Sequence, residues 1–194
     1  MRLFRLLKRK KHSKGHGIHS PFAFDIITSV LNSPYTYYAF TDIPDSFPYS
    51  KGQSKKLKKF HHLSFRLINH FRAQNILEIN PGDGLNTLYI KSPSSKINYK
   101  SISDINSFVN DGNIKFDAIF ININGDKTTV PSIEMLLDIS HDNTFWVINP
   151  INTKESKQFS QLIVNHESIT VSFDMSHTLI AFLRKSYYKH HYFI

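Results

Sequence analysis

Apolar residues change their spacing along the chain near residue 73. Before it they repeat at the three- and four-residue intervals of helices, and these patterns predict helices over residues 21–32 and 55–71. A serine N-cap followed by proline supports the start of the first helix. The intervening stretch, residues 33–54, is rich in proline and tyrosine without clean periodicity, so it predicts an ordered connection.

Short apolar runs typical of strands follow from residue 75, and helical patterns separate most of them. This alternation predicts a mostly parallel α/β sheet with helices on both faces. No helical pattern separates the last two runs, which are expected to form an antiparallel hairpin. The predicted strands are residues 75–79, 96–102, 116–123, 144–149, 169–175 and 178–185, and the helical patterns between them centre near residues 88, 108, 136 and 162.

These patterns divide the chain into two parts. Residues 1–72 are expected to form a basic N-terminal extension with helices packed on the core, and residues 73–194 the α/β domain itself. The 194-residue chain has no cysteine, which excludes a disulfide framework, a thiolate zinc site and a cysteine nucleophile. No apolar run approaches the roughly 20 residues needed to cross a bilayer, so a cytoplasmic protein is expected.

Positive charge gathers in the first third of the sequence. Residues 1–66 hold 13 Lys and Arg against three acids, and they account for the formal net charge of +9. The bases form clusters at residues 2–14 and 51–59, which could bind nucleic acid or an anionic membrane. The alternative is a solvated terminus, and we expect residues 1–14 to be mobile and dispensable for folding because they contain few large apolar residues.

The loop after the first predicted strand is the first place to look for a ligand. Ligands of open α/β sheets bind outside the carboxyl ends of the strands. Gly82 and Gly84 let the backbone pass close to a ligand there, although two glycines in this position are as often a plain turn. Glu78, near the strand end, could hydrogen-bond an amine or hydroxyl of the ligand, or simply cap the following helix.

The segment ILEINPGDGLNTLYI, residues 76–90, resembles motif I of the class I S-adenosylmethionine (SAM)-dependent methyltransferases. Three further segments resemble a bacterial group of small methyltransferase-like proteins: KGHGIHSPFAFDII, FRLINHF and VSFDMSHTLIAFLRK. The resemblance extends over about residues 14–193. It implies a Rossmann-like methyltransferase sheet with a reversed terminal hairpin, SAM as cofactor and a small-molecule substrate. The implied cofactor-binding residues are Glu78, Asn80, Gly82, Gly84 and Asn122.

The sequence departs from the methyltransferase pattern within the cofactor site. Asn80 stands where the first glycine of motif I is usual, and asparagine tolerates a positive φ better than most residues. The interval before the 116–123 strand is short enough to lack one strand–helix unit, so about six strands are expected. The lost piece would include the acid that receives the ribose hydroxyls, and Asp104 is the nearest acid. Weak SAM binding at residues 78–86 is therefore expected.

The positions that match the metal-binding and basic residues of catechol-type O-methyltransferases carry neutral residues. They are Asn122, Ile123, Gly125, Asn149, Pro150 and Asn152, and the nearest acid at that edge is Asp126. Neutral amides alone bind hard divalent cations poorly, and asparagine cannot accept a proton as a general base. Three functions stay open: a metal-independent methyltransferase, a pseudoenzyme with a binding or scaffolding role, and a nucleic-acid or membrane-surface binder.

Histidines occur near both ends of the chain. His12, His16 and His19 have the spacing of metal ligands on one helix face, but Gly15 and Gly17 oppose a helix there. We expect no metal site, and expect His16 and His19 instead to tie the N-terminal segment to the domain. His190 and His191 are expected on an edge strand at the surface.

Overall fold

The computed structural model describes residues 9, 12, 15–47, 54–103, 108, 114–123 and 130–194. The helices are α2 (Pro21–Asp25), η1 (Ile26–Leu31, a π-helix), α3 (Ala39–Ser46), α4 (Lys55–Phe71), α5 (Leu85–Lys91), α6 (Ile133–Asp138) and α7 (Lys154–Asn165). The strands are β1 (Asn75–Ile79), β2 (Asn98–Ile102), β3 (Phe116–Asn122), β4 (Ser140–Asn149), β5 (Val171–Asp174), β6 (Leu179–Phe182) and β7 (His190–Phe193).

The strands form one seven-stranded sheet in the order β2-β1-β3-β4-β6-β5-β7. Strands β2, β1, β3 and β4 are parallel, and β6 runs antiparallel to both β4 and β5. The predicted mixed α/β sheet with a reversed terminal hairpin is confirmed. The strand beyond the expected six is β7, which pairs in parallel with β5 at the edge and carries His190 and His191, as expected.

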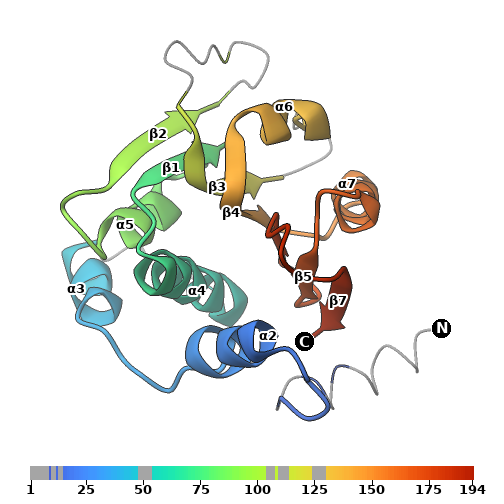
Figure 1. The fold of residues 1–194 in the computed structure, drawn as a ribbon. Coiled ribbons are helices and arrows are strands. Elements are labelled where there is room, and N and C mark those ends of the chain that lie inside the picture. Colours follow the sequence, from blue (N-terminus) through green and yellow to red (C-terminus); the bar gives the residue numbers. More distant parts are fainter. Residues whose placement is uncertain are drawn as a thin grey trace.

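Helices cover both faces of the sheet (Figure 1). On one face, α2, η1 and α4 pack against strand residues such as Ile76, Phe120 and Phe182. On the other face, α6 and α7 pack against Leu77, Trp146 and neighbouring side chains. Because side chains alternate along a strand, Glu78 projects to the same face as Ile76, where α4 and α5 lie. The sheet thereby fixes the direction of the acid that the sequence singled out.

The helix beginnings follow the local chemistry of the sequence. Ser20 Oγ accepts the amide of Ala23 at the start of α2, and Pro21 takes the first helical position. At the start of α4, Ser54 Oγ accepts the amide of Leu57. Both predicted helical segments are therefore confirmed, although the first becomes a π-helix after Asp25.

The prediction that residues 33–54 form only an ordered connection was wrong in part, because helix α3 lies within this stretch. This helix contains Pro44 and lacks a side-chain N-cap, so local sequence signals for it are weak. Tertiary packing supplies the stabilisation instead: Phe40 contacts Phe65 at 5.2 Å between ring centroids, and it stacks on His62 at 3.8 Å. The helical pattern predicted near residue 108 lies almost entirely outside the described residues.

The expected mobility of residues 1–14 stays a prediction, although the two residues of that segment which the structure describes both contact the domain. Arg9 forms an ion pair with Asp174 at 2.7 Å, and the ring of His12 lies 5.9 Å from that of Tyr192. The other residues of the segment lie outside the described part. His16 and His19, expected to tie the segment to the domain, are exposed and hydrogen-bond to no described residue.

Two glycines shape the chain between this segment and α2. Gly15 and Gly17 have φ of 76° and 72°, which excludes a continuous right-handed helix through His12, His16 and His19. Among the residues that the structure describes, no helix combines the length and the apolar character needed to cross a membrane.

Candidate functional site

A cavity of about 300 Å³ opens at the carboxyl ends of β1, β3 and β4. One wall is α4, and the floor is the loop that joins β1 to α5. The lining residues are Leu57, Phe60, His61, Pro81, Gly82, Asp83, Asn86, Asn122 and Asn149. The cavity therefore lies at the edge of the sheet where the sequence predicted a ligand.

The loop after β1 makes a tight turn through several left-handed residues. Asn80, Gly82 and Gly84 have φ of 56°, 65° and 75°. Asn80 thus takes the positive φ that it was expected to tolerate, and its Nδ2 donates to the carbonyl oxygen of Asn122 at 3.3 Å. Asp83 Oδ1 accepts the amide of Leu85 at 3.0 Å and stabilises the start of α5. The loop keeps its shape without the first glycine.

Glu78 is fully buried, and its carboxylate is surrounded by internal donors. Oε1 accepts from Asn86 Nδ2 at 2.9 Å and from Asn122 Nδ2 at 3.1 Å. Oε2 accepts from Thr87 Oγ1 and Tyr99 Oη, both at 2.7 Å. Burial and the Glu78 charge raise the pKa of Tyr99, so its phenol stays a donor. Glu78 therefore holds the side chains around the loop, rather than capping α5 as the alternative interpretation had it.

Two buried polar atoms next to this network have no hydrogen-bond partner among the described residues: Asn86 Oδ1 and His61 Nδ1. Both residues line the same cavity, and they are 5% and 3% exposed. An unpaired buried polar atom costs free energy of about 1–3 kcal/mol. A ligand with suitable polar groups would remove this cost at both atoms.

His61 is held neutral by its surroundings. Burial lowers its pKa from 6.5 to about 4, and the nearby Asp83 carboxylate offsets only part of this effect. The ring lies against Tyr89, with centroids 5.2 Å apart and planes at 22°. At neutral pH the imidazole is therefore a polar but uncharged part of the cavity wall.

The ends of β3 and β4 carry the neutral amides noted in the sequence. Asn122 and Asn149 are register partners across the two strands. Asn149 Nδ2 donates to Thr178 Oγ1 at 2.8 Å and to the His177 carbonyl at 3.1 Å, while the side chain of Asn152 is exposed. No group of three His, Asp or Glu residues that could hold a metal ion occurs within the described ranges. Asp104, Gly125 and Asp126 lie outside them.

A second cavity, of about 560 Å³, adjoins the first, and the two share Leu57, Phe60 and Asn149. Most of its lining is apolar, contributed by α4, the end of β4 and the β5–β6 turn. Lys56 and Lys59 of α4 also line it, and Lys56 Nζ lies 2.9 Å from His177 Nε2. The second cavity is therefore mainly apolar with cationic groups, and it lies beside the polar cavity that contains His61 and Asn86.

The structure brings Glu78, Asn80, Gly82 and Asn122 together at one edge of the sheet, and Gly84 follows in the same loop. Sequence reasoning missed His61 and did not assign a role to Asn86. A signal for His61 was available, since it is a polar residue on the apolar face of the α4 pattern. The partner of Asn86 could not be found without knowing which way Glu78 points.

No model of a known protein family matches the sequence, and no curated protein sequence matches it. Solved structures do match its fold. An O-methyltransferase from Bacillus cereus in complex with SAH is 15% identical, with a TM-score of 0.52 over 77% of this chain and 92% of that chain. The O-methyltransferase TomG from Streptomyces achromogenes, in complex with SAM, is 12% identical, with a TM-score of 0.52 over 77% and 91%.

A third similar structure is the SAH-bound methyltransferase PaMTH1 from Podospora anserina, 9% identical, with a TM-score of 0.50 over 84% of this chain and 96% of that chain. These identities are too low to transfer an activity. The similar structures themselves agree with the seven-stranded sheet and its reversed hairpin. The chain therefore has the Rossmann-like fold of class I methyltransferases.

Proposed function

We propose that this protein binds SAM in the cavity at the carboxyl ends of β1, β3 and β4 and transfers its methyl group to a small molecule. The observation that carries the proposal is the pair of buried polar atoms without partners, Asn86 Oδ1 and His61 Nδ1, on the wall of that cavity. The similar structures include O-methyltransferases in complex with SAM or SAH, which supports this choice of ligand.

The residues of the cavity fit a ligand with an ammonium group. Asn86 Oδ1 can only accept hydrogen bonds, and neutral His61 accepts at Nδ1 when its proton is on Nε2. Asn80, Gly82, Gly84 and Asn122 would form the rest of the cofactor surface. Glu78 would act indirectly, because its four internal hydrogen bonds hold Asn86 and Asn122 in place.

SAM supplies an electrophilic methyl group when it is bound. The described residues of the cavity offer only weak bases for a substrate hydroxyl. Asn122 and Asn149 are amides, the pKa of His61 is about 4, and the one carboxylate, Asp83, accepts the amide of Leu85 through Oδ1. Proximity and orientation would then supply the rate enhancement. A substrate whose nucleophile is already ionised, such as a carboxylate or an acidic phenol, would need no base from this cavity.

The adjoining apolar cavity is the proposed place for the substrate. Lys56 and Lys59 would attract an anionic group, and Phe60 and Leu63 would contact an apolar body. We therefore propose a small anionic substrate with an apolar part, methylated without a divalent metal.

Binding without turnover is the second candidate function. It is favoured by Asn122 and Asn149, whose amides neither bind a hard cation tightly nor accept a proton. Such a pseudoenzyme would keep the cavity but lack methyl transfer.

Thermal unfolding with and without SAH tests the binding step. A ligand of the folded state raises the melting temperature, so saturating SAH should do so for the protein and for Asn69→Leu, an exposed control on α4. Asn86→Leu, which removes the free acceptor, should abolish the rise. An equal rise in both variants would contradict the proposal. Methyl release from labelled SAM across small carboxylates and phenols would then separate an enzyme from a pseudoenzyme.

A further inference from the structure

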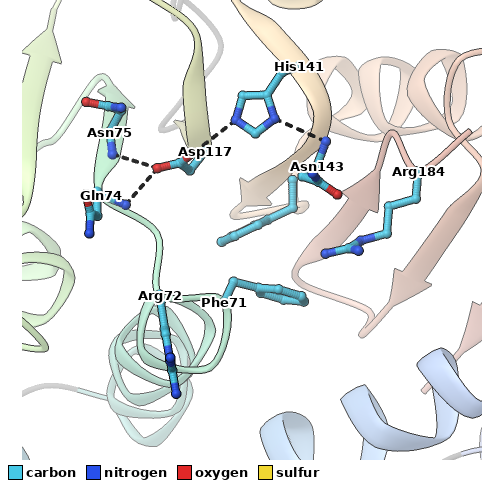
Figure 2. A pocket seen from close by; sticks show the side chains of 9 residues that line it. Phe71, Arg72, Gln74, Asn75, Asp117, His141, Asn143 and Arg184 are labelled. Carbon is cyan, nitrogen blue, oxygen red and sulfur yellow. Dashed lines mark hydrogen bonds and ion pairs between the residues drawn. The ribbon is translucent and has the colours of Figure 1, made fainter.

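A third cavity, of about 430 Å³, lies at the amino ends of the parallel strands, on the side of the sheet opposite to the carboxyl ends (Figure 2). It is bounded by the α4–β1 connection and by the first residues of β3 and β4. Its lining is Phe71, Arg72, Gln74, Asn75, Asp117, His141, Asn143, Phe145 and Arg184. The candidate methyltransferase site uses none of these residues.

The one carboxylate among these lining residues is already satisfied. Asp117 Oδ2 accepts the amides of Gln74 and Asn75 at 2.7 and 2.8 Å, and Oδ1 lies 3.0 Å from His141 Nε2. His141 Nδ1 accepts the amide of Asn143 at 3.1 Å, so the ring proton is on Nε2 and points to Asp117. Burial raises the pKa of Asp117, but these hydrogen bonds lower it further than burial raises it. Asp117 and His141 therefore form a structural unit whose hydrogen bonds are already made within the protein.

The Arg184 guanidinium, in contrast to the Asp117 carboxylate, has hydrogen-bond donors that are not satisfied by described residues. The guanidinium lies over the rings of Phe22 and Phe71, at 5.0 and 5.5 Å from their centroids. Within the described part of the chain, the buried Nε has no hydrogen-bond partner and the guanidinium has no carboxylate partner. Figure 2 shows the side chain reaching from the segment just after β6 toward Phe71, whereas Arg72 points away from the Asp117–His141 pair. Arg184 is thus a fixed cation with free donors.

We propose that this cavity binds a small polar carboxylate, with Arg184 as its anchor. A guanidinium offers a planar fork that matches a carboxylate in two parallel hydrogen bonds. The exposed side-chain amides of Gln74 and Asn143 hydrogen-bond to no described residue, and they can reach polar groups on the rest of the ligand. A monoanion is favoured over phosphate, because the charge of Asp117 in the same cavity opposes a second negative charge.

The Nε–H group of Arg184 gives a direct readout by NMR spectroscopy. Its ¹H–¹⁵N signal is assigned by its loss in Arg184→Lys, and the protein is titrated with sodium lactate, with sodium chloride at the same ionic strength as control. We expect the Arg184 signal to shift saturably with lactate and not with chloride. Binding followed through neighbouring backbone amides should weaken about tenfold in Arg184→Lys, because lysine cannot bind the carboxylate in the same two-pronged way.

Lys185→Gln is the matched control, since the neighbouring Lys185 pairs with Asp142 on the surface and lines no part of this cavity. It should bind lactate as the unmodified protein does. The proposal is overturned by equal shifts with lactate and chloride, by a larger response to phosphate than to lactate, or by unchanged binding in Arg184→Lys. Because the signal is read on the unmodified protein, poor folding of a variant cannot hide a negative result.

Discussion

The Glu78 carboxylate connects three elements through one side chain, because its donors come from α5, β2 and β3. A buried ion is tolerated only when hydrogen bonds replace the water that it loses. Four donors do so here, and the same contacts orient two amides of the candidate site, Asn86 and Asn122. The proposed role of Glu78 in cofactor binding therefore depends on its structural role.

Replacing Glu78 with glutamine should lower the free energy of unfolding by about 2–3 kcal/mol. Glutamine keeps the shape of the side chain but has one acceptor oxygen, and its NH₂ group faces donors. Urea unfolding measures the loss. Glu167→Gln, which changes an exposed glutamate, should alter stability by less than about 0.5 kcal/mol. Equal effects of both changes would show that the buried network contributes little.

His61 should make stability depend on pH. Its pKa is about 4 in the folded protein and 6.5 when unfolded, so only the unfolded state binds the proton between these values. The contribution is fully present above pH 6.5 and is lost as the pH falls toward 4, by at most about 3 kcal/mol. Unfolding free energies at pH 7.5, 5.5 and 4.5 should fall less steeply in His61→Phe. Parallel curves would contradict the lowered pKa.

Helix α4 begins with charges that oppose its dipole. Lys55, Lys56, Lys58 and Lys59 occupy the first turns without any acid, although the amino end of a helix carries partial positive charge. Helix stability alone would not select this arrangement. It is consistent with the proposed use of Lys56 and Lys59 to attract an anionic substrate.

The change Lys55→Glu should therefore raise the free energy of unfolding by about 0.5–1 kcal/mol at low salt. Lys55 does not line either cavity, so ligand binding should persist. Lys96→Glu, in the turn before β2, provides a control of equal charge change without a helix end. A gain of similar size in the control would indicate general relief of positive charge rather than the dipole.

Strands β5 and β7 are joined to the N-terminal segment by Arg9. Its guanidinium pairs with Asp174 and donates to the Ile194 carbonyl at 3.1 Å, and it also contacts Ser176. Side chains of Arg9 and Asp174 are only 20% and 27% exposed, so solvent weakens the pair less than it weakens a fully exposed one.

Removing this pair should cost about 1 kcal/mol, measured as a lower melting temperature of Arg9→Gln. Lys157→Gln, on exposed α7 surface nearby, is the control and should have no effect. An unchanged melting temperature in Arg9→Gln would support the expectation that residues 1–14 are dispensable.

For the whole molecule, much of the fold could be predicted from hydrophobic periodicity. The alternation after residue 75 indicates the parallel sheet because each buried strand leaves an apolar run and each helix an amphipathic one. Helix α3 could not be predicted, because its stability comes from contacts of Phe40 with distant rings. Strand β7 has no apolar run either, since its edge position leaves His190 exposed.

The location of the candidate site could be predicted from the sequence, but the contacts of its side chains could not. The glycines after β1 mark the loop, since a turn that needs positive φ favours them. The free atoms of His61 and Asn86 depend on how α4 and α5 pack over the strand ends, which no local pattern contains.

Divalent metal should have no effect on the protein. Asn122 and Asn149, which are register partners at the ends of β3 and β4, are neutral amides and bind a hard cation poorly. Magnesium, manganese and EDTA should leave both the melting temperature and any methyl transfer unchanged. A metal-induced rise in melting temperature that disappears in Asp126→Asn would reverse this conclusion.

Isothermal titration with SAH tests the central claim, that the cavity at the carboxyl ends of β1, β3 and β4 is a cofactor site. The account predicts saturable binding to one site, abolished by Gly82→Val and retained by Gly17→Val, which strains a similar positive φ far from the cavity. Absence of binding heat at several temperatures, or equal binding by both variants, would contradict it.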